Sequence, residues 1–474
     1  MSLCKELDQR IKNGTITVLG IGISNRPLID YLLERGARIT ARDKKNYEAL
    51  MPHSKELEEK GVKLILGDDY LEGIDEDVIF RAPGIRPDLT QIDAAVRKGA
   101  LLTSEMELFF ELTPATVLAI TGSDGKTTTT TLTYKILEAE LKKKGKGKVW
   151  VGGNIGAPLL PHVKEMTEND FAVVELSSFQ LFTMRRSPSR AIMTNVTPNH
   201  LDWHSDMDEY IEAKCNICRH SPISHITVNS ENEITAEIGR NSDMHVTFFS
   251  SKRTDFASVT HLKVNASAIY EKNGYITFSD GKTEEQIIKT EDIKLPGRHN
   301  VENYMAAISI TRGLVSNDTI DEVAKTFCGV AHRLEFVREL DGIKYYNSSI
   351  DSSPTRTAAA LSALREKPIV ICGGYDKQIP FEPLADALSA KAKKVILTGA
   401  TAPKIKAALL ACPTFDAVKL PVIEKSDFEE AVKAARDAAE CGDTVLLSPA
   451  CASFDAFPNF EIRGNHFKEI VNAF

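Results

Sequence analysis

The segment at residues 121–128, TGSDGKTT, is a glycine-containing turn between a short apolar run and a helical pattern. The apolar run at 115–120 predicts a buried strand, and the spacing of Leu132, Ile136 and Ala139 predicts the helix that follows. In that setting backbone N–H groups at the positive end of a helix dipole can hold phosphate oxygens. The pattern therefore predicts a nucleotide-triphosphate site made by Gly122, Ser123, Asp124, Gly125, Lys126, Thr127 and Thr128.

Two side chains of this turn have specific expected roles. Lys126 should reach the β- and γ-phosphates, and Thr127 should offer its hydroxyl to Mg²⁺. The match to G-x-x-x-x-G-K-[ST] departs at one place, because the usual first glycine falls on Ile120 and the additional glycine is Gly122. A turn that binds no ligand is the alternative interpretation.

Length and composition indicate a globular, cytoplasmic protein. A chain of 474 residues corresponds to about three domains of typical size. Its net charge of −8 gives no electrostatic reason to expect nucleic acid or an anionic membrane as a partner. The N-terminus is charged where a signal peptide needs an apolar stretch, and no apolar run is long enough to span a membrane. The eight cysteines should be free thiols, because the cytoplasm is reducing. The one C-x-x-C pair, Cys215 and Cys218, lacks the second pair of a zinc site.

The first hundred residues alternate strands and helices. A strand at 15–19, a glycine turn at 20–24, a helix at 27–35 and a strand at 39–42 ending at Asp43 form half of a dinucleotide-binding fingerprint. Asn25 replaces the third glycine, so both a plain structural turn and a site for a nucleotide-linked ligand stay open. A second turn, residues 82–85, follows a strand at 78–80 and is expected to line the same pocket.

The rest of the chain continues the same alternation. In the middle portion we expect strands at 171–176, 191–196 and 225–228, a surface loop at 142–149 and a small β insertion at about 250–293. In the last portion we expect strands at 369–372, 395–397 and 444–447 and a helix at 428–440. The predicted fold is α/β with three domains, at residues 1–108, 109–331 and 332–474.

Metal-competent side chains follow two strands of the middle portion. Glu175 ends the strand in VVELSSFQL, and His200 and Asp202 follow another strand in NVTPNHLDWH. In an open α/β sheet such strand ends carry the ligands, and a carboxylate there can complete a Mg²⁺ shell with Thr127. A lone loop histidine is more often a surface group, but its position beside a phosphate turn favours a ligand role.

Several motifs in fixed order resemble the cytoplasmic muramyl ligases of peptidoglycan synthesis. They are TGSDGKTT, GGNIGAP, VVELSSFQL, NVTPNHLDWH, GRHNVENYMAA, AHRLEFV, GGYDK and SPACASFDAFPNFEIRGNHF. The last is most similar to members that add D-glutamate to UDP-N-acetylmuramoyl-L-alanine. The resemblance implies a Rossmann-like N-terminal domain that binds the UDP substrate, a central P-loop ATPase domain and a mobile Rossmann-like C-terminal domain. It also implies ATP-dependent amide ligation through an acyl phosphate, and we expect a monomer.

The resemblance also implies a set of site residues. Lys126, His200 and Lys214 are expected to be catalytic, and Thr127, Glu175 and His200 to hold one or two Mg²⁺ ions. Lys214 matches a lysine that CO₂ carbamylates in this family, which would let it engage the second metal. The remaining matches are Asn300, Asn303, His332 and Arg333 for ATP; Ser24, Asp43, Gly84, Asn154, Ser177 and Gln180 for the UDP substrate and its phosphates; and Lys377, Ser453 and Phe460 for D-glutamate.

The chain departs from the family pattern at two places. Where the family reads roughly N-D-S-K-A-T, this chain has Ser348 and Ile350 in place of the aspartate and the lysine. We hypothesise that Asp351 and Arg356 in the same loop take over one or both of their contacts. Ala82 stands where a serine is more familiar, which removes a hydroxyl from the UDP site.

Three alternative functions stay open at this point. A related amide ligase, such as a folylpolyglutamate synthase or a ligase for another amino acid, would share the phosphate turn. A nucleotide-switch protein would share it as well, but would leave the loops of His200 and Lys377 unexplained. A dehydrogenase is suggested only by Gly20 and Gly22.

Overall fold

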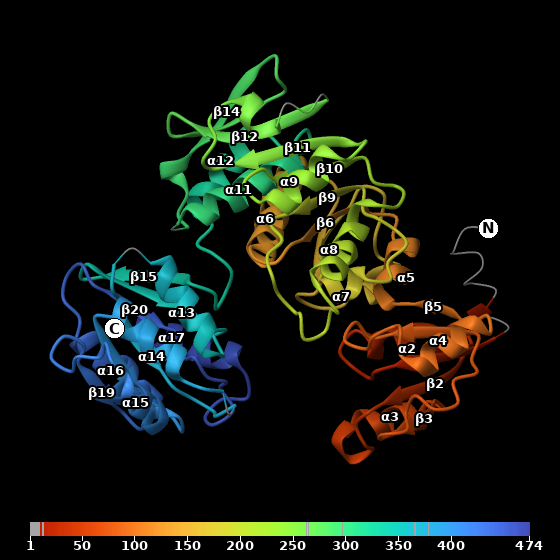
Figure 1. Cartoon of the computed structure of the whole chain (residues 1–474), viewed down its shortest axis with the longest axis horizontal. Helices are drawn as coiled ribbons and strands as arrows, with labels where there is room; N and C mark the ends of the chain where they lie inside the picture. Colours follow the sequence, from red (N-terminus) through yellow and green to blue (C-terminus); the bar gives the residue numbers. More distant parts are fainter. Residues whose placement is uncertain are drawn as a thin grey trace. The chain divides into compact units, whose positions relative to one another are not determined.

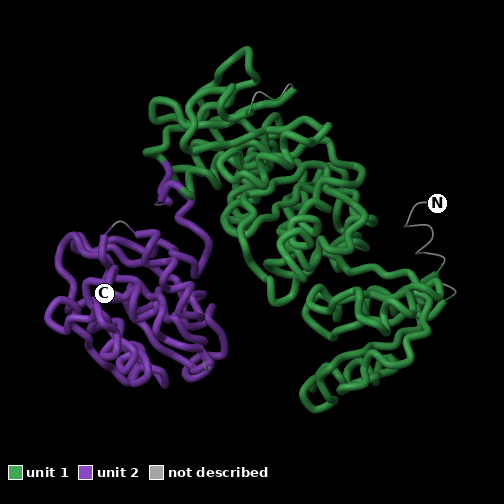
Figure 2. The backbone as a smooth tube through the Cα atoms, viewed as in Figure 1, with its two compact units in different colours: residues 1–292, 299–325 green, residues 293–298, 326–474 purple. Residues whose placement is uncertain are grey.

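The computed structural model of the chain describes residues 10–11, 14–261, 263, 265–295, 297–364, 366–377 and 379–474. These residues form three β-sheets that are accompanied by helices throughout, which confirms the predicted α/β class (Figure 1). The chain divides into two compact units (Figure 2). The first comprises residues 1–292 and 299–325, and the second comprises residues 293–298 and 326–474.

The first sheet has five parallel strands in the order β3-β2-β1-β4-β5. The sequence order reverses between β1 and β4, and an open parallel sheet binds ligands at such a point, beyond the carboxyl ends of its strands. The turns after these two strands are adjacent, because the N–H of Ala82 donates to the carbonyl of Leu19. The elements are β1 (Thr15–Leu19), α2 (Asn25–Leu33), β2 (Arg38–Asp43), α3 (His53–Glu59), β3 (Lys63–Leu66), β4 (Val78–Arg81), α4 (Thr90–Arg97) and β5 (Leu101–Thr103).

The second sheet has nine strands in the order β14-β13-β12-β11-β10-β9-β6-β8-β7. Strand β6 (Thr116–Thr121), which pairs in parallel with β8 and β9, has four apolar residues in a row, and its last five residues are buried, as expected for a parallel strand covered on both faces. The other strands are β7 (Val149–Gly153), β8 (Phe171–Glu175), β9 (Arg190–Met193), β10 (His225–Asn229), β11 (His245–Ser250), β12 (Ala266–Lys272), β13 (Tyr275–Ser279) and β14 (Glu284–Lys289). The helices of this region are α5 (Glu105–Leu112), α6 (Lys126–Lys144), α7 (Ser178–Leu181), α8 (Met207–Cys215), α9 (Glu233–Arg240), α10 (Phe256–Thr260), α11 (Arg298–Thr311) and α12 (Asn317–Thr326).

Three expectations for this region need correction. The predicted loop at 142–149 is shorter than expected, because its lysines at 142–144 form the last turn of α6. The helix ends before Gly145, which has a φ of 65°. The predicted β insertion is part of the main sheet, since β12 pairs parallel with β11 and antiparallel with β13. Strand β9 also ends three residues earlier than predicted, at Met193.

The third sheet has six strands in the order β15-β16-β20-β17-β18-β19. Strands β15 and β16 are antiparallel, and the others pair in parallel. The strands are β15 (Glu335–Leu340), β16 (Ile343–Asn347), β17 (Ile369–Cys372), β18 (Lys394–Leu397), β19 (Val422–Glu424) and β20 (Thr444–Leu447). The helices are α13 (Pro354–Ala363), α14 (Glu382–Lys391), α15 (Ala402–Ala411), α16 (Phe428–Asp437) and α17 (Phe460–Ala473).

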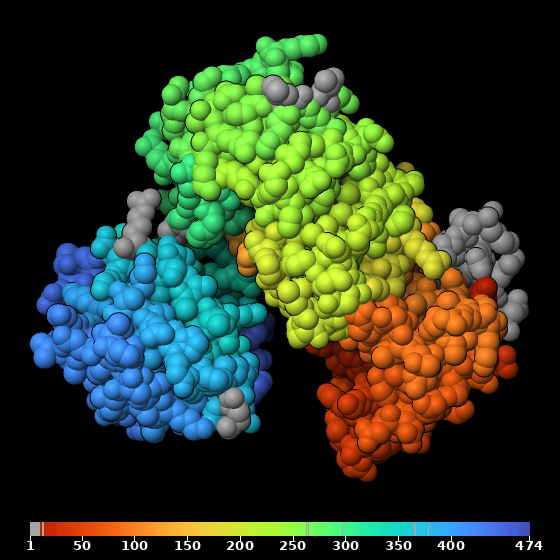
Figure 3. Space-filling model, viewed as in Figure 1, coloured from red at the N-terminus to blue at the C-terminus, as the bar shows by residue number. Residues whose placement is uncertain are grey.

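The first two sheets belong to one compact unit, and in Figure 3 the surface atoms of the N-terminal region (orange) touch those of the middle region (yellow-green). The three sheets lie within residues 15–103, 116–289 and 335–447. The division into domains at 1–108, 109–331 and 332–474 stays a prediction, because the compact units number two. In the part of the chain that the structure describes, no helix has the length and apolarity needed to cross a membrane.

Candidate functional site

The phosphate turn has the geometry that its glycines predict. Strand β6 ends at Thr121 and α6 begins at Lys126. Gly122 and Gly125 have φ angles of 148° and 78°, which residues with a Cβ rarely adopt. A Cβ added to Gly122 would lie 1.9 Å from Oγ1 of Thr194, and one added to Gly125 would lie 2.7 Å from Oδ1 of Asn303. The turn therefore requires glycine at both places.

Lys126 is the first residue of α6, a helix of 19 residues, and its ammonium group folds back onto the turn. The Lys126 ammonium donates to the carbonyl oxygens of Gly122 and Ser123, both at 2.9 Å. Thr127 and Thr128 follow in the first turn of α6 and are partly exposed, whereas Asp124 is exposed. An anion at this point would meet the helix N-terminus and the lysine together.

Residues far along the chain support the turn from two sides. The backbone N–H of Asp124 donates to Oδ1 of Asn195, at 2.9 Å. On α11, Asn303 accepts from Oγ1 of Thr129 at 3.1 Å and donates to Oδ1 of Asn300 at 3.0 Å. Both predicted asparagines thus lie beside the phosphate turn.

Glu175, at the end of β8, has a carboxylate that is only half satisfied. It is 1% exposed, and its Oε1 accepts a hydrogen bond from Nδ2 of Asn154 at 2.9 Å. Its Oε2 is buried and has no hydrogen-bond partner among the described residues. A buried carboxylate oxygen without a donor is costly unless a cation or a proton meets it, so this atom fits a divalent cation.

Lys214 is the most deeply buried lysine of the site, at 1% exposed. Its ammonium donates to the carbonyl oxygen of Gly122 at 2.8 Å and lies 4.7 Å from the centre of the Tyr210 ring. Burial and the nearby charge of Lys126 lower the pKa of Lys214 to about 7. A large part of this amine is therefore neutral, and nucleophilic, at physiological pH.

His200 lies in a tight turn after β9. It has a φ of 56°, and its carbonyl oxygen accepts the N–H groups of Trp203 at 3.1 Å and His204 at 3.0 Å. Its ring packs edge-on against Phe179, with ring centres 4.9 Å apart. Partial desolvation and the charge of Lys126 lower the pKa of His200, which favours the neutral, metal-binding form. Asp202 in the same turn is exposed.

Ser177 and Gln180 form a capping box at the start of α7. The N–H of Gln180 donates to Oγ of Ser177 at 3.2 Å, and Oε1 of Gln180 accepts the N–H of Ser177 at 3.0 Å. Because Glu175 ends the preceding strand, this cap fixes the path of the chain directly after the unsatisfied carboxylate. Both residues thus have a local structural task besides the predicted one.

The predicted UDP-site residues of the first sheet lie at the ends of its inner strands. Ser24 precedes α2, and its hydroxyl makes no cap to that helix. Asp43, at the end of β2, accepts the N–H of Ile21 at 2.7 Å and that of Lys45 at 2.9 Å, so it holds the glycine turn after β1. Gly84 lies in the turn after β4, and its carbonyl oxygen accepts Nε1 of Trp203 at 3.0 Å.

The second unit contains the predicted residues His332, Arg333, Lys377, Ser453 and Phe460. The hydroxyl of Ser349 donates to the carbonyl of Phe460 at 2.8 Å, and buried Arg463 joins Ser349 to the carbonyl of Ala452, next to Ser453. Lys377 is exposed and donates to the hydroxyl of Ser352 at 3.1 Å. The loops after β16, β17 and β20 thus meet at one edge of this sheet.

The loop after β16 contains Ser348 and Ile350, where the family pattern has an aspartate and a lysine, and also the two hypothesised substitutes, Asp351 and Arg356. Ser348 accepts the N–H of Leu334 at 3.1 Å, next to Arg333. The Asp351 carboxylate is buried, accepts the Ser448 hydroxyl at 2.8 Å and has its pKa raised to about 6 by burial. Arg356 is exposed and reaches the carbonyl of Ile350. Of the two hypothesised substitutes, Arg356 is the exposed one.

A metal-binding cluster of three or more His, Cys, Asp or Glu side chains is absent from the described residues. Cys215 and Cys218 are free thiols, and burial raises their pKa to about 11 and about 12. A cation beside Glu175 would therefore have to complete its coordination shell with Thr127, with water or with phosphate oxygens. Mg²⁺ usually keeps several water and phosphate ligands of this kind.

Sequence reasoning missed several residues that shape the site. Tyr210 contacts the phosphate turn through a hydrogen bond between its hydroxyl and that of Ser123, at 3.0 Å. Thr194 donates to the carbonyl of Asp124 at 2.6 Å. Trp203 and His204 lie within the motif NVTPNHLDWH, in which the sequence predicts a role only for His200 and Asp202.

Two family models match the chain. The Mur ligase middle domain matches residues 120–311. The Mur ligase, glutamate ligase domain matches residues 332–451. Together they cover the phosphate turn, Glu175, His200 and Lys214 and, in the second unit, the loops after β16 and β17, but they end before Ser453 and Phe460.

Curated relatives are similar over almost the whole length. The UDP-N-acetylmuramoylalanine–D-glutamate ligase of Acetivibrio thermocellus is 48% identical over 473 residues, which are 99% of this chain and 98% of the relative. The enzymes of the same name from Clostridium novyi and Clostridium kluyveri are 47% and 48% identical, each over 98% of both chains.

Solved structures of related ligases share the fold. The UDP-N-acetylmuramate–alanine ligase of Thermotoga maritima has a TM-score of 0.53 at 18% identity, over 97% of this chain and 100% of that one. A pseudomurein peptide ligase type C from Methanothermus fervidus has a TM-score of 0.51 at 19% identity, over 97% and 100%. At such identities the likeness concerns the fold alone.

Proposed function

Because the chain belongs to the family of UDP-N-acetylmuramoylalanine–D-glutamate ligases, we propose that it uses ATP to join D-glutamate to UDP-N-acetylmuramoyl-L-alanine in the cytoplasm. The product is a precursor of peptidoglycan. The observation that carries this proposal is the phosphate turn with Lys126, the half-satisfied carboxylate of Glu175 and buried Lys214 around it.

The reaction needs ATP because a carboxylate is a poor electrophile. In the first step an oxygen of the acceptor carboxylate attacks the γ-phosphorus, the bond to the β–γ bridging oxygen breaks, and ADP leaves. The amine of D-glutamate then attacks the carbon of the acyl phosphate. Phosphate leaves with the electron pair, and the nitrogen loses a proton to give the amide.

Charge neutralisation is the main task of the protein in the first step, because two anions must meet. Lys126 and the backbone N–H groups of the turn would hold the β- and γ-phosphates, as donors aimed at developing charge do in phosphoryl transfer. Asn300, Asn303 and Arg333 would contact the rest of the nucleotide.

Magnesium fits the donor set next to this turn. Thr127, Glu175 and His200 would hold it, and the unpartnered Oε2 of Glu175 is the atom that supports this assignment. When bound, Mg²⁺ neutralises phosphate charge and polarises the phosphoryl oxygens. The number of ions, one or two, is part of the proposal.

Lys214 is proposed to react with CO₂ and form a carbamate. The ammonium form first loses one proton. The neutral amine then adds to the carbon of CO₂ and releases a second proton, so the change from cation to carbamate anion releases two protons in all. The lowered pKa of Lys214 supports this step, because only the unprotonated amine reacts. A carbamate at this buried position would be able to share a metal with His200.

The remaining predicted residues would bind the two substrates. Along the acceptor these are Ser24, Asp43, Gly84, Asn154, Ser177 and Gln180. D-Glutamate would be held by Lys377, Ser453 and Phe460, where a lysine balances its carboxylates. We also propose that the chain acts as a monomer of three domains, at 1–108, 109–331 and 332–474.

An ADP-release assay tests the proposal. With Mg²⁺, ATP and UDP-N-acetylmuramoyl-L-alanine, ADP release should depend on D-glutamate and should not respond to L-glutamate, L-alanine or L-lysine. Release that is indifferent to every amino acid would contradict the ligase proposal and favour a nucleotide switch. Release that follows another amino acid would identify a different ligase.

A further inference from the structure

A group of side chains outside the expected site joins the UDP-substrate turn to the turn of His200. We call Arg86, Trp203, His204 and Glu209 the bridging cluster. Arg86 follows Gly84 in the turn after β4, whereas Trp203 and His204 follow His200, and Glu209 lies in the first turn of α8. All of them lie in the same compact unit.

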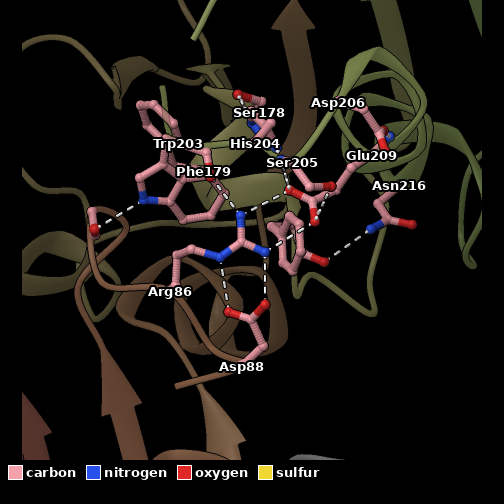
Figure 4. A network of polar contacts seen from close by, with 12 residues as sticks. Arg86, Asp88, Ser178, Phe179, Trp203, His204, Ser205, Asp206, Glu209 and Asn216 are labelled. Carbon is pink, nitrogen blue, oxygen red and sulfur yellow. Dashed lines mark hydrogen bonds and ion pairs between the residues drawn. The ribbon is translucent and has the colours of Figure 1, made fainter. Parts of the chain in front are cut away.

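Arg86 is the centre of the cluster (Figure 4). Its Nη1 and Nη2 donate to the two carboxylate oxygens of Glu209 at 3.0 and 2.9 Å, and its Nε and Nη2 donate to Asp88 at 2.8 and 2.7 Å. The guanidinium also donates to the carbonyl of Trp203 and lies 4.9 Å from the centre of that ring. The planar guanidinium fork, with two parallel hydrogen bonds to one carboxylate, fixes the orientation of that carboxylate as well as its distance. The single ammonium group of a lysine cannot do this.

Glu209 also contacts residues that follow His200. Its Oε1 accepts Nδ1 of His204 at 3.2 Å, and it also accepts the N–H of Ser205 at 3.1 Å. His204 is fully buried in its side chain, and its Nε2 contacts the hydroxyl of Ser178 at 2.9 Å. Through Ser178 the cluster reaches the helix that begins directly after Glu175 and Ser177.

Trp203 closes the cluster from the other side. Its Nε1 donates to the carbonyl of Gly84, and its ring packs edge-on against Phe179, with ring centres 4.8 Å apart. Phe179 in turn packs against His200. One tryptophan therefore contacts a predicted UDP-site residue and the aromatic partner of a predicted metal ligand.

We propose that Arg86, Trp203 and Glu209 are positioning residues that set the spacing between the UDP-binding turn and the His200 turn for the acceptor substrate. The inference rests on the proposed function, because the acceptor must span both turns. A long substrate fixed at one end reaches the phosphoryl site correctly only if this spacing is held, and a displacement of about 1 Å can cost about 100-fold in rate.

Steady-state kinetics with each substrate varied in turn test the proposal. Arg86→Gln should lower kcat/KM for UDP-N-acetylmuramoyl-L-alanine by about tenfold or more and leave KM for ATP within about twofold. Arg86→Lys, which keeps the charge but loses the fork, should recover only part of the loss. A purely structural role would lower kcat in proportion to unfolded protein and leave every KM unchanged, which would overturn the proposal.

A double-mutant cycle checks that Arg86 acts through Glu209. The double variant Arg86→Gln/Glu209→Gln should lose less in the logarithm of kcat/KM than the two single variants lose together, because both single variants break the same Arg86–Glu209 ion pair. Fully additive losses would contradict the coupling. The matched control is Arg186→Gln, which breaks another two-contact ion pair, with Glu111 on α5, and should leave acceptor kinetics unchanged.

A milder variant keeps the test valid if Arg86→Gln fails to fold. Trp203→Phe keeps one aromatic ring against Arg86 and Phe179 but removes the donor to the Gly84 carbonyl, and it should raise KM for the acceptor selectively. Unchanged acceptor kinetics in this variant would count against the proposal. Wild-type protein that shows no D-glutamate-dependent turnover would instead contradict the proposed function, so the two failures are distinguishable.

Discussion

The ammonium group of Lys214 donates a hydrogen bond to the carbonyl oxygen of Gly122, at 2.8 Å. This bond ties α8 to the phosphate turn from inside the protein, beside the Tyr210 ring. Lys126 donates to the same carbonyl from the other side, at 2.9 Å. Two lysine amino groups therefore converge on one carbonyl oxygen of the turn, and Lys126 supplies positive charge there.

Carbamylation of Lys214 predicts a dependence on dissolved CO₂. Protein prepared in bicarbonate-free buffer should have a lower kcat, and bicarbonate should restore it, because the neutral amine recaptures CO₂. With ¹³C-bicarbonate, one labelled carbamate signal should appear in the NMR spectrum and vanish in Lys214→Met. Full activity without bicarbonate, together with an absent label, would show that Lys214 acts as a plain amine.

Removal of the phosphate-turn cation should abolish most of the chemistry. Lys126→Ala is expected to lower D-glutamate-dependent ADP release by roughly 100-fold or more, because one donor is lost from a phosphoryl-transfer site. The thermal midpoint should change little. Lys142→Ala, in the exposed last turn of the same helix, is the control and should behave as wild type. Turnover near that of wild type in Lys126→Ala would remove the turn from the mechanism.

The half-satisfied carboxylate predicts an altered need for magnesium. Glu175→Gln keeps the volume of the side chain and can still accept from Asn154, but it loses the charge that a cation needs. The Mg²⁺ concentration for half-maximal activity should rise by about tenfold, since a charged ligand is replaced by a neutral one. Titration of activity with MgCl₂ measures this shift. An unchanged Mg²⁺ dependence would place the metal elsewhere.

The fold was predictable where local pattern and burial agree. Strands β1, β17 and β20 have the bounds expected from their apolar runs, because each is a buried inner strand of a parallel sheet. The loop expected at 142–149 was misplaced because lysine is a good helix former and Gly145 ends the helix only after three of them. Strand β9 ends early because Thr194 and Asn195 turn to hold Asp124.

The candidate site also contains parts that the sequence predicts and parts that it does not. The phosphate turn is a short local motif, so glycine spacing alone predicts it. The contact of Arg86 with Glu209 joins residues 123 positions apart, and neither lies in a pattern that signals its partner. Asn25 shows a third case, because its Nδ2 donates to the carbonyls of Leu19 and Gly20 and so holds the turn in which it replaces a glycine.

Glu105, at the start of α5, predicts a pH dependence of stability. It is 5% exposed, and its Oε1 has no hydrogen-bond partner among the described residues. Burial raises its pKa from 4.5 to about 7, although the N–H of Leu160 opposes the shift. Between these two values the folded state binds more protons than the unfolded state, so this carboxyl makes the protein less stable as the pH rises.

Glu105→Gln imitates the protonated acid and should remove this dependence. Its free energy of unfolding should match that of wild type near pH 4.5 and exceed it increasingly up to pH 7, by up to about 1.4 kcal/mol per pH unit. Urea unfolding at several pH values measures this difference in unfolding free energy. The buried carboxyl of Glu107 is present in both proteins, so its effect on stability cancels in the difference. Glu168→Gln, at an exposed carboxyl, is the control and should show a constant difference. A difference between Glu105→Gln and wild type that does not grow with pH would mean that Glu105 ionises freely in the folded protein.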